Sequence, residues 1–552
     1  MSTVAFRFSI RTLNPFTRGW IPTFKGMTKL HLLTLALCFF TLSCGPAAIG
    51  TSASGSSTPS ASQGKSDAGQ NVQSAPSGKV VVGMTVDANS LDFMRMNTTN
   101  PEFTLASHIF DTLVARDDDM QIKPSLAESW KLVNDLTWEF TLRKGVKFHN
   151  GEPFNAAAVK FTFDRAVDPA TKSADQVVRY IDFDRVEVID DYTVRIVTKS
   201  PAPAMLARLA LFYMLPPKYY SDNSMETVAS KPVGTGAFKF VEWVKNDHIT
   251  LEANPDYFAG PPSIKTLVFR PIPEVGTRLA ELKSGGIDIA IAIPPDQAKS
   301  VESATTRLES VEGGRRIIVG FHIVKGSPIE DKRVRQAINY AVDVDTITKS
   351  LLGGYGQRRF TLVTPASTSP NIKPWPYDPA KAKQLLAEAG YPNGFSITLD
   401  TPTGRYIKDK EVAEAIADYL TKIGITTTVK SFDWSTYTTQ LLMPKKSDPM
   451  FLLGFSSNFD PVLDMAMLDY QSALNPTEWN NEQFQSLLKQ IYTTMDDKKR
   501  QDLIYKAQEL ANEEAPIIWM YFQPDLYGVN KRLDWKPRVD EYVLLHKAKI
   551  NK

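Results

Sequence analysis

The sequence predicts an α/β fold built as at least two lobes. Its 552 residues are enough for two or more domains of ordinary size. With 43% hydrophobic and 22% charged residues, the composition is that of a folded globular protein. Strand patterns are most frequent early in the chain and helix patterns late, and both kinds occur throughout, which favours an α/β arrangement.

Three early segments have the patterns of β-strands. Residues 80–86 are mostly apolar and predict a first strand. Residues 137–143 alternate between apolar and polar side chains, as in a half-buried strand, and end at the turn signal Lys144-Gly145. Residues 186–196 place valines and an isoleucine on both sides of Asp190-Asp191, which predicts a hairpin.

Five later segments carry apolar residues with helical spacing. In residues 379–389, Asp378 is expected to cap the helix, Pro379 fits its first position and Gly390 fits the residue after its end. The apolar stripes of all five segments are expected to face a core rather than a cofactor. The other four segments are residues 334–341, 408–423, 484–491 and 503–510.

The N-terminus has the features of a lipoprotein signal. Leu30–Leu42 is a mostly apolar run of thirteen residues preceded by Lys29, which is short for a membrane-spanning helix of about 20 residues and suits a signal peptide. The following Ser43-Cys44 resembles a bacterial lipoprotein cleavage site, with Cys44 as the lipidated first residue of the mature chain. A short buried segment with an incidental cysteine is the alternative. Because a start at Met27 would give a signal of ordinary length, residues 1–26 are either an extension or follow a wrongly chosen start.

Residues 44–78 are expected to tether the folded body to a membrane. The stretch Gly50–Gly78 is rich in Ser, Ala and Gly and cannot bury enough apolar surface to offset chain entropy, so we expect a flexible linker. Residues 1–43 hold five of the 63 basic residues and none of the 61 acidic ones, so the mature body is mildly acidic. A lipid, a linker and a large body predict a protein anchored on the outer side of a membrane, or facing the periplasm.

Several classes of function lack their motifs in this sequence. The two cysteines, Cys38 and Cys44, leave the folded body without a disulfide, a thiolate zinc site or a cysteine nucleophile. No phosphate-binding loop, no serine-hydrolase elbow and no local pair of zinc-binding histidines occurs. We therefore expect no catalytic centre, no metal and no cofactor, and a net charge of +2 gives no basis for nucleic-acid binding. A surface hydrolase with two carboxylates distant in sequence stays open.

Five segments in order resemble the extracellular solute-binding proteins of the dipeptide, oligopeptide and nickel group, family 5, which are the binding subunits of ABC importers. Within the first segment, Gly145 serves a tight turn and Asn155 a helix cap. The matches together span roughly residues 80–525. They are PSLAESW (124–130) with TWEFTLRKGVKFHNGEPFN (137–155), PVGTGAFKFVEWVKNDHITLEANPDYF (232–258) with RLAELKSGGIDIA (278–290), VRQAINYAVD (334–343), YDPAKAKQLLAEAGY (377–391) and residues 424–461.

The resemblance implies a two-lobe clamp like that of periplasmic binding proteins, of type II, in the large peptide-binding subclass with an extra subdomain. Lobe I would comprise residues 79–320 and 524–552 with a subdomain inserted at about 116–231, and lobe II residues 321–523. The resemblance also implies that the protein is a monomer and is not an enzyme. It would enclose a peptide or peptide-sized solute and deliver it to ABC permease and ATPase subunits. A solute sensor that does not import needs the same clamp and is a further alternative.

The run Gly454–Pro461 is expected to touch the solute. Peptide-binding relatives have a pattern resembling Gly-Trp-x-x-Asp here, followed by Asp-Pro, and the first Asp pairs with the peptide ammonium. In this chain the Trp position is Phe455, the first Asp position is Asn458, and Asp460 precedes the proline. Asn carries no charge for an ammonium group, so either another carboxylate replaces it or the solute has no cationic peptide end. Loop and turn roles are the alternatives for Asn458 and Asp460.

Four further residues are candidates for the same site. Trp434 and Tyr437 offer aromatic faces that suit sugar rings, side chains or heteroaromatic ligands, with core packing as the alternative. Arg405 could pair with a carboxylate or phosphate, or it could face solvent. Tyr355 lies in a glycine-flanked loop. Peptides, oligosaccharides, opine-like compounds and metal chelates all remain open as ligands.

Overall fold

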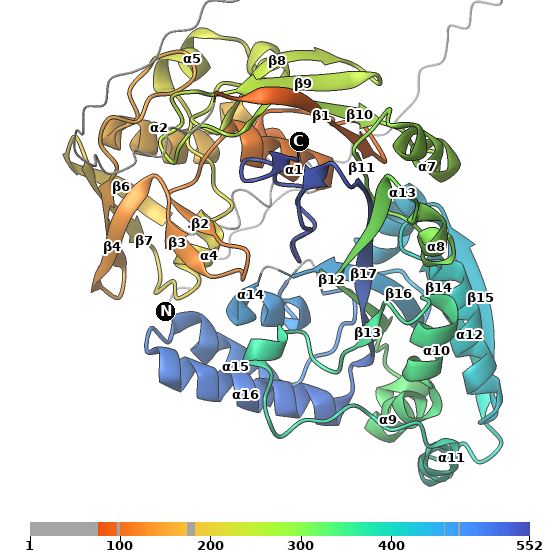
Figure 1. The fold of residues 1–552 in the computed structure, drawn as a ribbon. Helices are drawn as coiled ribbons and strands as arrows, with labels where there is room; N and C mark the ends of the chain where they lie inside the picture. Colours follow the sequence, from red (N-terminus) through yellow and green to blue (C-terminus); the bar gives the residue numbers. More distant parts are fainter. Residues whose placement is uncertain (1–74, 97–99, 174–182, 458, 473–474, 552) are drawn as a thin grey trace, which may run out of the picture. The chain divides into compact units, whose positions relative to one another are not determined.

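An eleven-stranded mixed sheet runs through the part of the chain that the computed structural model describes. This part comprises residues 75–96, 100–173, 183–457, 459–472 and 475–551, all within the compact unit Val72–Lys552. The strand order is β15-β14-β16-β12-β17-β11-β1-β10-β9-β8, and β13 pairs with β17 (Figure 1). The strands are β1 (Ser77–Met84), β8 (Phe238–Val244), β9 (His248–Ala253), β10 (Ile264–Pro271), β11 (Ile289–Ala290), β12 (Thr306–Phe321), β13 (Gln357–Arg358), β14 (Phe395–Pro402), β15 (Ile425–Phe432), β16 (Met450–Ser456) and β17 (Ile517–Asn530).

Separate hydrophobic cores divide this sheet into two lobes. The cores of the first lobe draw their buried residues from 80–301 and 526–548. Its further elements are α1 (Asn100–Ile109), α7 (Val275–Ser284), α8 (Ala298–Val301), β18 (Leu533–Asp534) and β19 (Lys549–Ile550). This confirms the predicted two-lobe α/β class.

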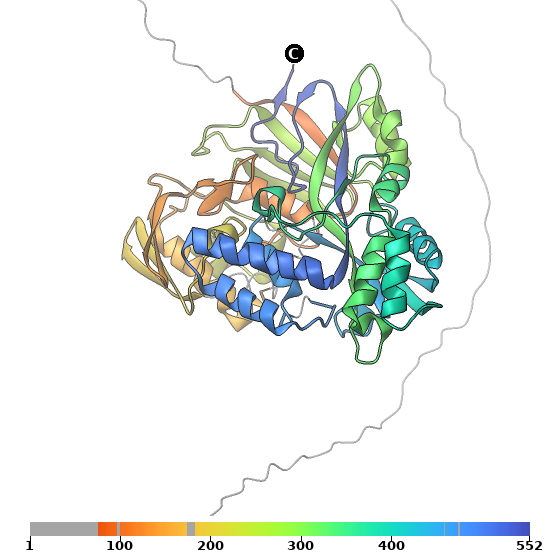
Figure 2. The ribbon, with the colours of Figure 1, turned by 90° about the horizontal axis from the view of Figure 1, so that it is seen from below.

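The cores of the second lobe draw their buried residues from 317–521, joined by Ala204. Its helices cover both faces of its part of the sheet, and α15 and α16 pack side by side across one of them (Figure 2). The helices are α9 (Lys332–Ala341), α10 (Val344–Leu351), α11 (Pro379–Glu388), α12 (Asp409–Thr421), α13 (Trp434–Thr436), α14 (Pro461–Met465), α15 (Glu482–Thr493) and α16 (Asp497–Glu514).

A second sheet forms an extra subdomain on the first lobe. Its four antiparallel strands lie in the order β4-β5-β7-β6, and their buried side chains join the first lobe's core (Figure 1). The elements are β2 (Val114–Arg116), β3 (Ile122–Pro124), β4 (Ala127–Asn134), β5 (Thr137–Leu142), α2 (Ala156–Val167), β6 (Phe183–Asp190), β7 (Thr193–Thr198), α4 (Met205–Leu209), α5 (Pro217–Asp222) and α6 (Met225–Ser230).

Local sequence signals located most of these elements. The predicted hairpin is β6–β7, and the alternating strand is β5. Asn155 accepts from the backbone N–H groups of the first turn of α2, and Asp378 accepts from Lys381 in α11, so both predicted caps are confirmed. The first strand is one exception, because β1 ends at Met84 and Val86 is 51% exposed.

Tyr437 lies in the core of the second lobe, although it was expected to face a solute. It opens a π-helical segment, Tyr437–Leu442, and its side chain is fully buried. Its hydroxyl donates to the carbonyl of Leu452 in β16 at 2.7 Å. Burial of the ring and use of the hydroxyl by the backbone make Tyr437 part of the packing between α13 and the sheet.

Tyr437→Phe should therefore lower stability and leave solute affinity unchanged. Removing the hydroxyl deprives the buried Leu452 carbonyl of a donor, a loss of about 1–2 kcal/mol in the free energy of unfolding. Chemical denaturation measures this loss, and Tyr377→Phe at an exposed tyrosine is the control. Weaker solute binding with unchanged stability would contradict this assignment.

A buried carboxyl group in the same lobe makes stability depend on pH. Asp400 in β14 is 1% exposed and its Oδ2 accepts from the backbone N–H of Asp448 at 2.7 Å. Burial, together with the neighbouring Asp448 carboxyl, raises the pKa of Asp400 from 3.8 to about 7. Between these values the folded chain holds a proton that the unfolded chain has lost, so this stabilising contribution is full below pH 3.8 and is lost as pH rises through 7.

Asp400→Asn, which mimics the protonated acid, should lose less stability than the wild type between pH 5 and pH 8. Denaturant unfolding at the two pH values gives the difference, and Asp418→Asn at an exposed position on α12 should leave it unchanged. An identical pH dependence in Asp400→Asn and the wild type would refute the link to Asp400.

Candidate functional site: the crossing between the lobes

The candidate site lies where β12 and β17 pass from one lobe to the other. In the first lobe, Thr306–Glu312 of β12 pairs with Pro524–Asn530 of β17. In the second lobe, Arg316–Gly320 pairs with Ile517–Phe522. The register breaks between these ladders, so Gly313–Arg315 has no regular partner on β17. A break in both the pairing and the core at one place gives the sheet a natural point of bending.

Two glycines allow three segments to meet at this break. A Cβ on Gly313 would lie 2.3 Å from Oδ2 of Asp525, closer than side-chain atoms can approach. A Cβ on Gly314 would lie 2.8 Å from the ring of Phe459 and 2.9 Å from the carbonyl oxygen of Val539. Because neither glycine has a Cβ, β17, the loop after β16 and the C-terminal tail can all approach the backbone of Gly313-Gly314 closely.

A cluster of charges surrounds the glycine pair. Arg315 pairs with Glu541 of the C-terminal tail at 3.0 Å, and both side chains are nearly buried, at 13% and 12% exposure. The guanidinium of Arg315 also lies 6.0 Å from the ring centre of Tyr406. Burial, and then the charge of Glu541, raises the pKa of Asp525 well above its usual range despite the nearby Arg315. The crossing thus contains acidic and basic groups held in a poorly solvated place.

Arg405 extends over an aromatic platform at the carboxyl end of β14. Its guanidinium lies 5.0 Å from the ring centre of Trp434 and 5.6 Å from that of Tyr406. The buried carboxyl of Asp409 accepts from the backbone N–H groups of Gly404, Arg405 and Tyr406 at 2.9–3.1 Å, which fixes the loop. The Arg405 side chain is exposed, and the described residues give it no ion pair. An exposed arginine close to two aromatic rings is suited to bind a carboxylate.

The other predicted residues take different places. Phe455 lies half-buried on β16, opposite Arg316, and packs against the second lobe's core. Tyr355 packs against a core of the first lobe, although its loop belongs to the second. Asn458 and Cys44 lie outside the described residues.

Asp460 is a helix cap. One of its carboxyl oxygens, Oδ1, accepts from the backbone N–H groups of Val462 and Leu463 at the start of α14. Burial is the main cause that raises the pKa of Asp460 above its usual value, and the nearby charge of Asp464 adds to it. These two hydrogen bonds agree with the turn role considered for Asp460.

The loop after β16 also bridges to the subdomain of the first lobe. Arg116 in β2 donates to the carbonyl of Phe459 at 3.3 Å and lies 5.9 Å from the centre of its ring. Ser457 donates its backbone N–H to the carbonyl of Gly314 at 2.8 Å. The segment that follows Gly454 thus contacts both lobes.

Sequence reasoning missed five residues of this site: Arg315, Tyr406, Asp409, Asp525 and Glu541. They come from four segments whose proximity only the fold reveals. The pair Gly313-Gly314, followed by two arginines directly before the apolar run Ile317–Val319, is the one local signal of an irregular place.

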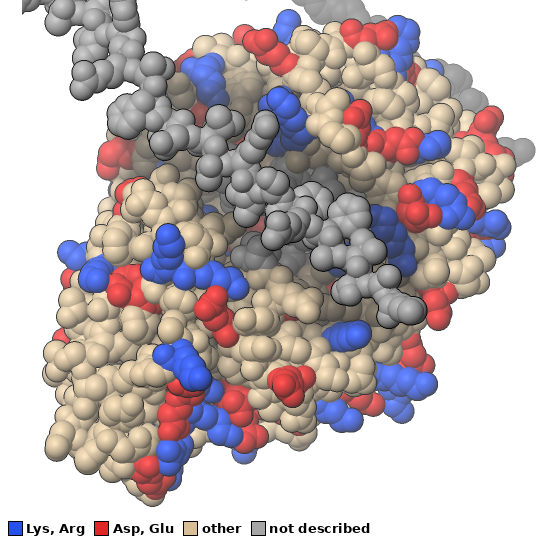
Figure 3. Space-filling model, turned by 180° about the vertical axis from the view of Figure 1, so that it is seen from behind, with Lys and Arg blue, Asp and Glu red and all other residues tan. Residues whose placement is uncertain are grey.

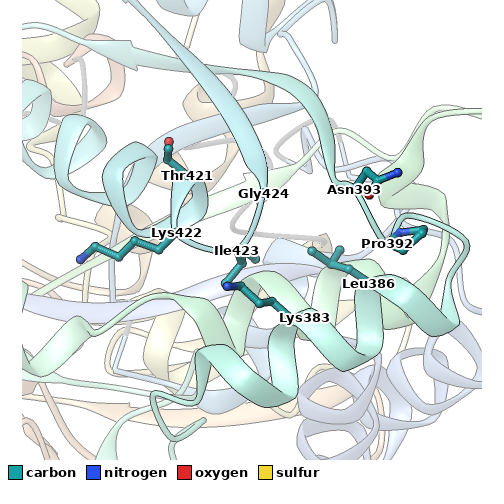
Figure 4. Close-up of a pocket in the computed structure, with 8 residues that line it drawn as sticks. All are labelled: Lys383, Leu386, Pro392, Asn393, Thr421, Lys422, Ile423 and Gly424. Atoms are coloured by element: carbon teal, nitrogen blue, oxygen red, sulfur yellow. The ribbon is translucent and has the colours of Figure 1, made fainter.

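A separate depression lies at the other end of the second lobe. It encloses about 400 Å³ between α11 and the turn from α12 to β15, and Lys383, Leu386, Pro392 and Lys422 are among its lining residues (Figure 4). It adjoins the amino ends of β14 and β15, whereas Arg405 follows the carboxyl end of β14, about 23 Å away along the strand. This depression is not part of the crossing.

On the face shown in Figure 3, and among the described residues, neither charge nor metal ligands nor apolar helices mark a further candidate site. Lysines and arginines are interspersed with aspartates and glutamates on the face shown in Figure 3. Among the described residues, no group of three or more His, Cys, Asp or Glu side chains is placed to hold a metal ion. The same residues contain no helix long and apolar enough to cross a membrane.

Comparison with known proteins agrees with this architecture. Residues 121–475 match the sequence model of the bacterial extracellular solute-binding proteins, family 5 Middle. The chain is 31% identical over 482 residues to the glutathione-binding protein GsiB of Pectobacterium atrosepticum, which covers 84% of this chain and 91% of GsiB. It is 32% identical to heme-binding protein A of Haemophilus influenzae, over 75% of this chain and 81% of that protein.

A solved structure has the same fold over nearly its whole length. The periplasmic binding protein DppA from Helicobacter pylori, associated with an ABC transporter and determined in complex with the peptide STSA, is 27% identical. It aligns with a TM-score of 0.73 over 86% of this chain and 98% of DppA. The matched length, the identities and the shared two-lobe fold lead to one conclusion: the chain belongs to family 5 of the bacterial extracellular solute-binding proteins.

Proposed function

We propose that this chain is the solute-binding subunit of an ABC importer and captures a peptide-sized solute through a carboxylate. The observation that supports this most directly is Arg405, an exposed guanidinium without an ion pair among the described residues, which lies 5.0 Å from the ring centre of Trp434 and 5.6 Å from that of Tyr406. A carboxylate accepts two parallel hydrogen bonds from such a guanidinium. Phe455 and Tyr355 are weaker candidates, because each is half-buried against a core, Phe455 in the second lobe and Tyr355 in the first.

The relatives bind solutes that carry carboxylates. One relative is described as binding glutathione, another as binding heme, and the solved DppA holds a peptide. These solutes differ in size and shape, but each has at least one carboxylate. This supports a carboxylate-binding role for Arg405 better than it supports any single solute.

The two-lobe fold supplies the mechanism of capture. A solute favours the closed clamp only if it contacts the lobes better when they are shut. We place the bending point at Gly313–Arg315 in β12 and at Gln523 in β17. From the sequence, lobe I was expected to end at residue 320 and lobe II to begin at residue 321. In the structure, the core of the second lobe already includes Ile317. Lobe I would then comprise residues 79–312 and 524–552.

Removing the charge of Arg405 should weaken solute binding selectively. Because charge-assisted hydrogen bonds contribute about 1.5–3 kcal/mol, Arg405→Gln should reduce affinity by roughly 10- to 100-fold. Arg405→Lys keeps the positive charge but cannot donate two parallel hydrogen bonds, so its affinity should lie between those of the wild type and Arg405→Gln. Calorimetry with glutathione and short peptides measures these affinities, and Arg185→Gln at an exposed arginine of the subdomain is the control.

Peptides with amidated C-termini provide the complementary test. They should bind the wild type weakly, and Arg405→Gln should not weaken their binding further. If amidated and free peptides bind equally well, and Arg405→Gln changes neither, the carboxylate assignment fails.

Native mass spectrometry of the purified protein would identify a retained solute directly. Conversion of a panel compound into product would favour the surface hydrolase, and absence of co-purifying permease and ATPase subunits would favour a sensor.

The N-terminus completes the proposal as a lipid anchor. We propose that residues 1–43 are removed, that Cys44 carries the lipid, and that residues 44–78 hold a monomeric binding domain at the outer side of the cell membrane or in the periplasm. A lipid-modified cysteine with several acyl chains binds membranes far more firmly than a single chain does.

Cys44→Ser should release the protein from the membrane fraction. The substitution removes the thiol to which the lipid attaches, so metabolic labelling with a fatty-acid analogue should fall to background. Cys38→Ser, inside the apolar run, is the matched control and should stay labelled and membrane-bound. Retention of Cys44→Ser in washed membranes would argue against this anchor.

A further inference from the structure

Arg316 of β12 and Asp464 of α14 form a buried ion pair beside the crossing. Nη2 of the guanidinium lies 2.8 Å from Oδ1 of the carboxylate, and the two side chains are 4% and 0% exposed. Taking both charges out of water is costly, and apolar residues of similar volume in place of such a pair often leave a protein as stable or more stable. The stability of the second lobe therefore does not explain why the chain keeps two charges here.

The carboxylate of Asp464 also binds the loop after β16. Its Oδ2 accepts from the hydroxyl of Ser457 at 2.9 Å, and that hydroxyl accepts from the backbone N–H of Phe459 at 2.9 Å. Each donor in this chain of hydrogen bonds points toward Asp464, and Arg316 donates to the same carboxylate through its other oxygen. The buried ion pair is thus connected, through one hydroxyl, to the backbone of the loop.

Phe459 has a backbone conformation that few side chains adopt. Its φ is +50°, in the left-handed region. Its N–H is bound by Ser457 and its carbonyl accepts from Arg116 of the first lobe, and a Cβ on Gly314 would lie 2.8 Å from its ring. A residue keeps such a conformation only where its surroundings fix it, and residues of this kind are concentrated at functional sites such as ligand clamps.

The helix that carries Asp464 has other contacts that start it and hold it in place. Asp460 caps its first turn, and Val462 and Met465 belong to the second lobe's core. The ion pair adds a fixed acceptor for Ser457, and through Ser457 a fixed position for the N–H of Phe459. The loop that it fixes belongs to the run Gly454–Pro461, which the sequence predicts to touch the solute.

From these contacts we infer that Arg316 and Asp464 are positioning residues for solute binding. The inference rests on the proposed function and adds that this ion pair holds the loop after β16 in its binding shape before the solute arrives. Both side chains are buried, so they act through Ser457 and not by touching the solute. A loop that is fixed beforehand loses less freedom on binding, so the affinity for different solutes depends on the pair, whichever group binds Arg405.

The test is a double-mutant cycle on the full-length protein, with reduced glutathione and the tetrapeptide Ser-Thr-Ser-Ala as probes. Arg316→Met/Asp464→Leu replaces the ion pair by apolar side chains, and Ser457→Ala removes the hydroxyl that connects the pair to the loop. Calorimetry should show that each of these two variants binds the probes roughly tenfold more weakly than the wild type. When Ser457→Ala is added to Arg316→Met/Asp464→Leu, the affinity should fall no further, because the connection is already broken.

Two controls and a melting temperature separate positioning from folding. Ser457→Thr keeps a hydroxyl on the same carbon and should retain wild-type affinity. Ser486→Ala, at an exposed serine of α15, should leave the affinity unchanged. The ligand-free melting temperature of Arg316→Met/Asp464→Leu should equal or exceed that of the wild type, because the cost of burying two charges is gone.

The outcomes separate this inference from the proposed function. Wild-type affinity in Ser457→Ala or in Arg316→Met/Asp464→Leu overturns the positioning role while solute binding stands. So does an equal loss from Ser457→Ala with and without the ion pair, which would mean that the hydroxyl touches the solute itself. A lower melting temperature of Arg316→Met/Asp464→Leu would show a structural role and also overturn the inference. If the wild type binds neither probe, the proposed function fails for peptides and the inference fails with it.

Discussion

The close approach of backbone at Gly313 and Gly314 is the constraint on which the rest of the site depends. Three segments from distant parts of the sequence meet there: β17, the loop after β16 and the C-terminal tail. Each would collide with a Cβ on β12. Because the ladder between β12 and β17 is interrupted at the same residues, the sheet is weakest where these segments converge. The place where the chain can bend is therefore also the place where side chains of both lobes come together.

The division of the cores makes this convergence useful. Apolar burial is concentrated within 80–301 and 526–548 on one side and within 317–521 on the other, so each lobe is stabilised chiefly by its own contacts. Between them lie polar links such as Arg315–Glu541 and the contact of Arg116 with Phe459. Polar links between rigid lobes can be exchanged for contacts with a solute at little cost in packing, which is what a clamp requires.

The sequence predicted the elements whose signals are local. Asn155 and Asp378 cap helices because an Asx side chain reaches the N–H groups two or three residues ahead, and that geometry depends on few neighbours. Tyr437 shows the limit: its spacing from Trp434 puts both on one side of a helix, but β16 lies close enough to bury one ring and not the other. Asp525 had no local signal, because its environment is created by Gly313 and Glu541, which lie far away in the sequence.

The charged groups at the crossing differ in how far the chain itself neutralises them. A site built only for packing would pair every buried charge inside the chain, as Arg316 and Asp464 are paired. Arg405 and Asp525 differ from that pair in two ways. The Arg405 guanidinium is exposed and has no ion pair among the described residues, whereas Oδ2 of Asp525 is buried without a hydrogen bond, and burial raises the pKa of that carboxyl. A solute carboxylate would give Arg405 the ion pair that the described residues do not give it. A solute that makes this ion pair with the second lobe and also contacts the first lobe would favour the closed clamp, so the same contact would serve closure as well as recognition.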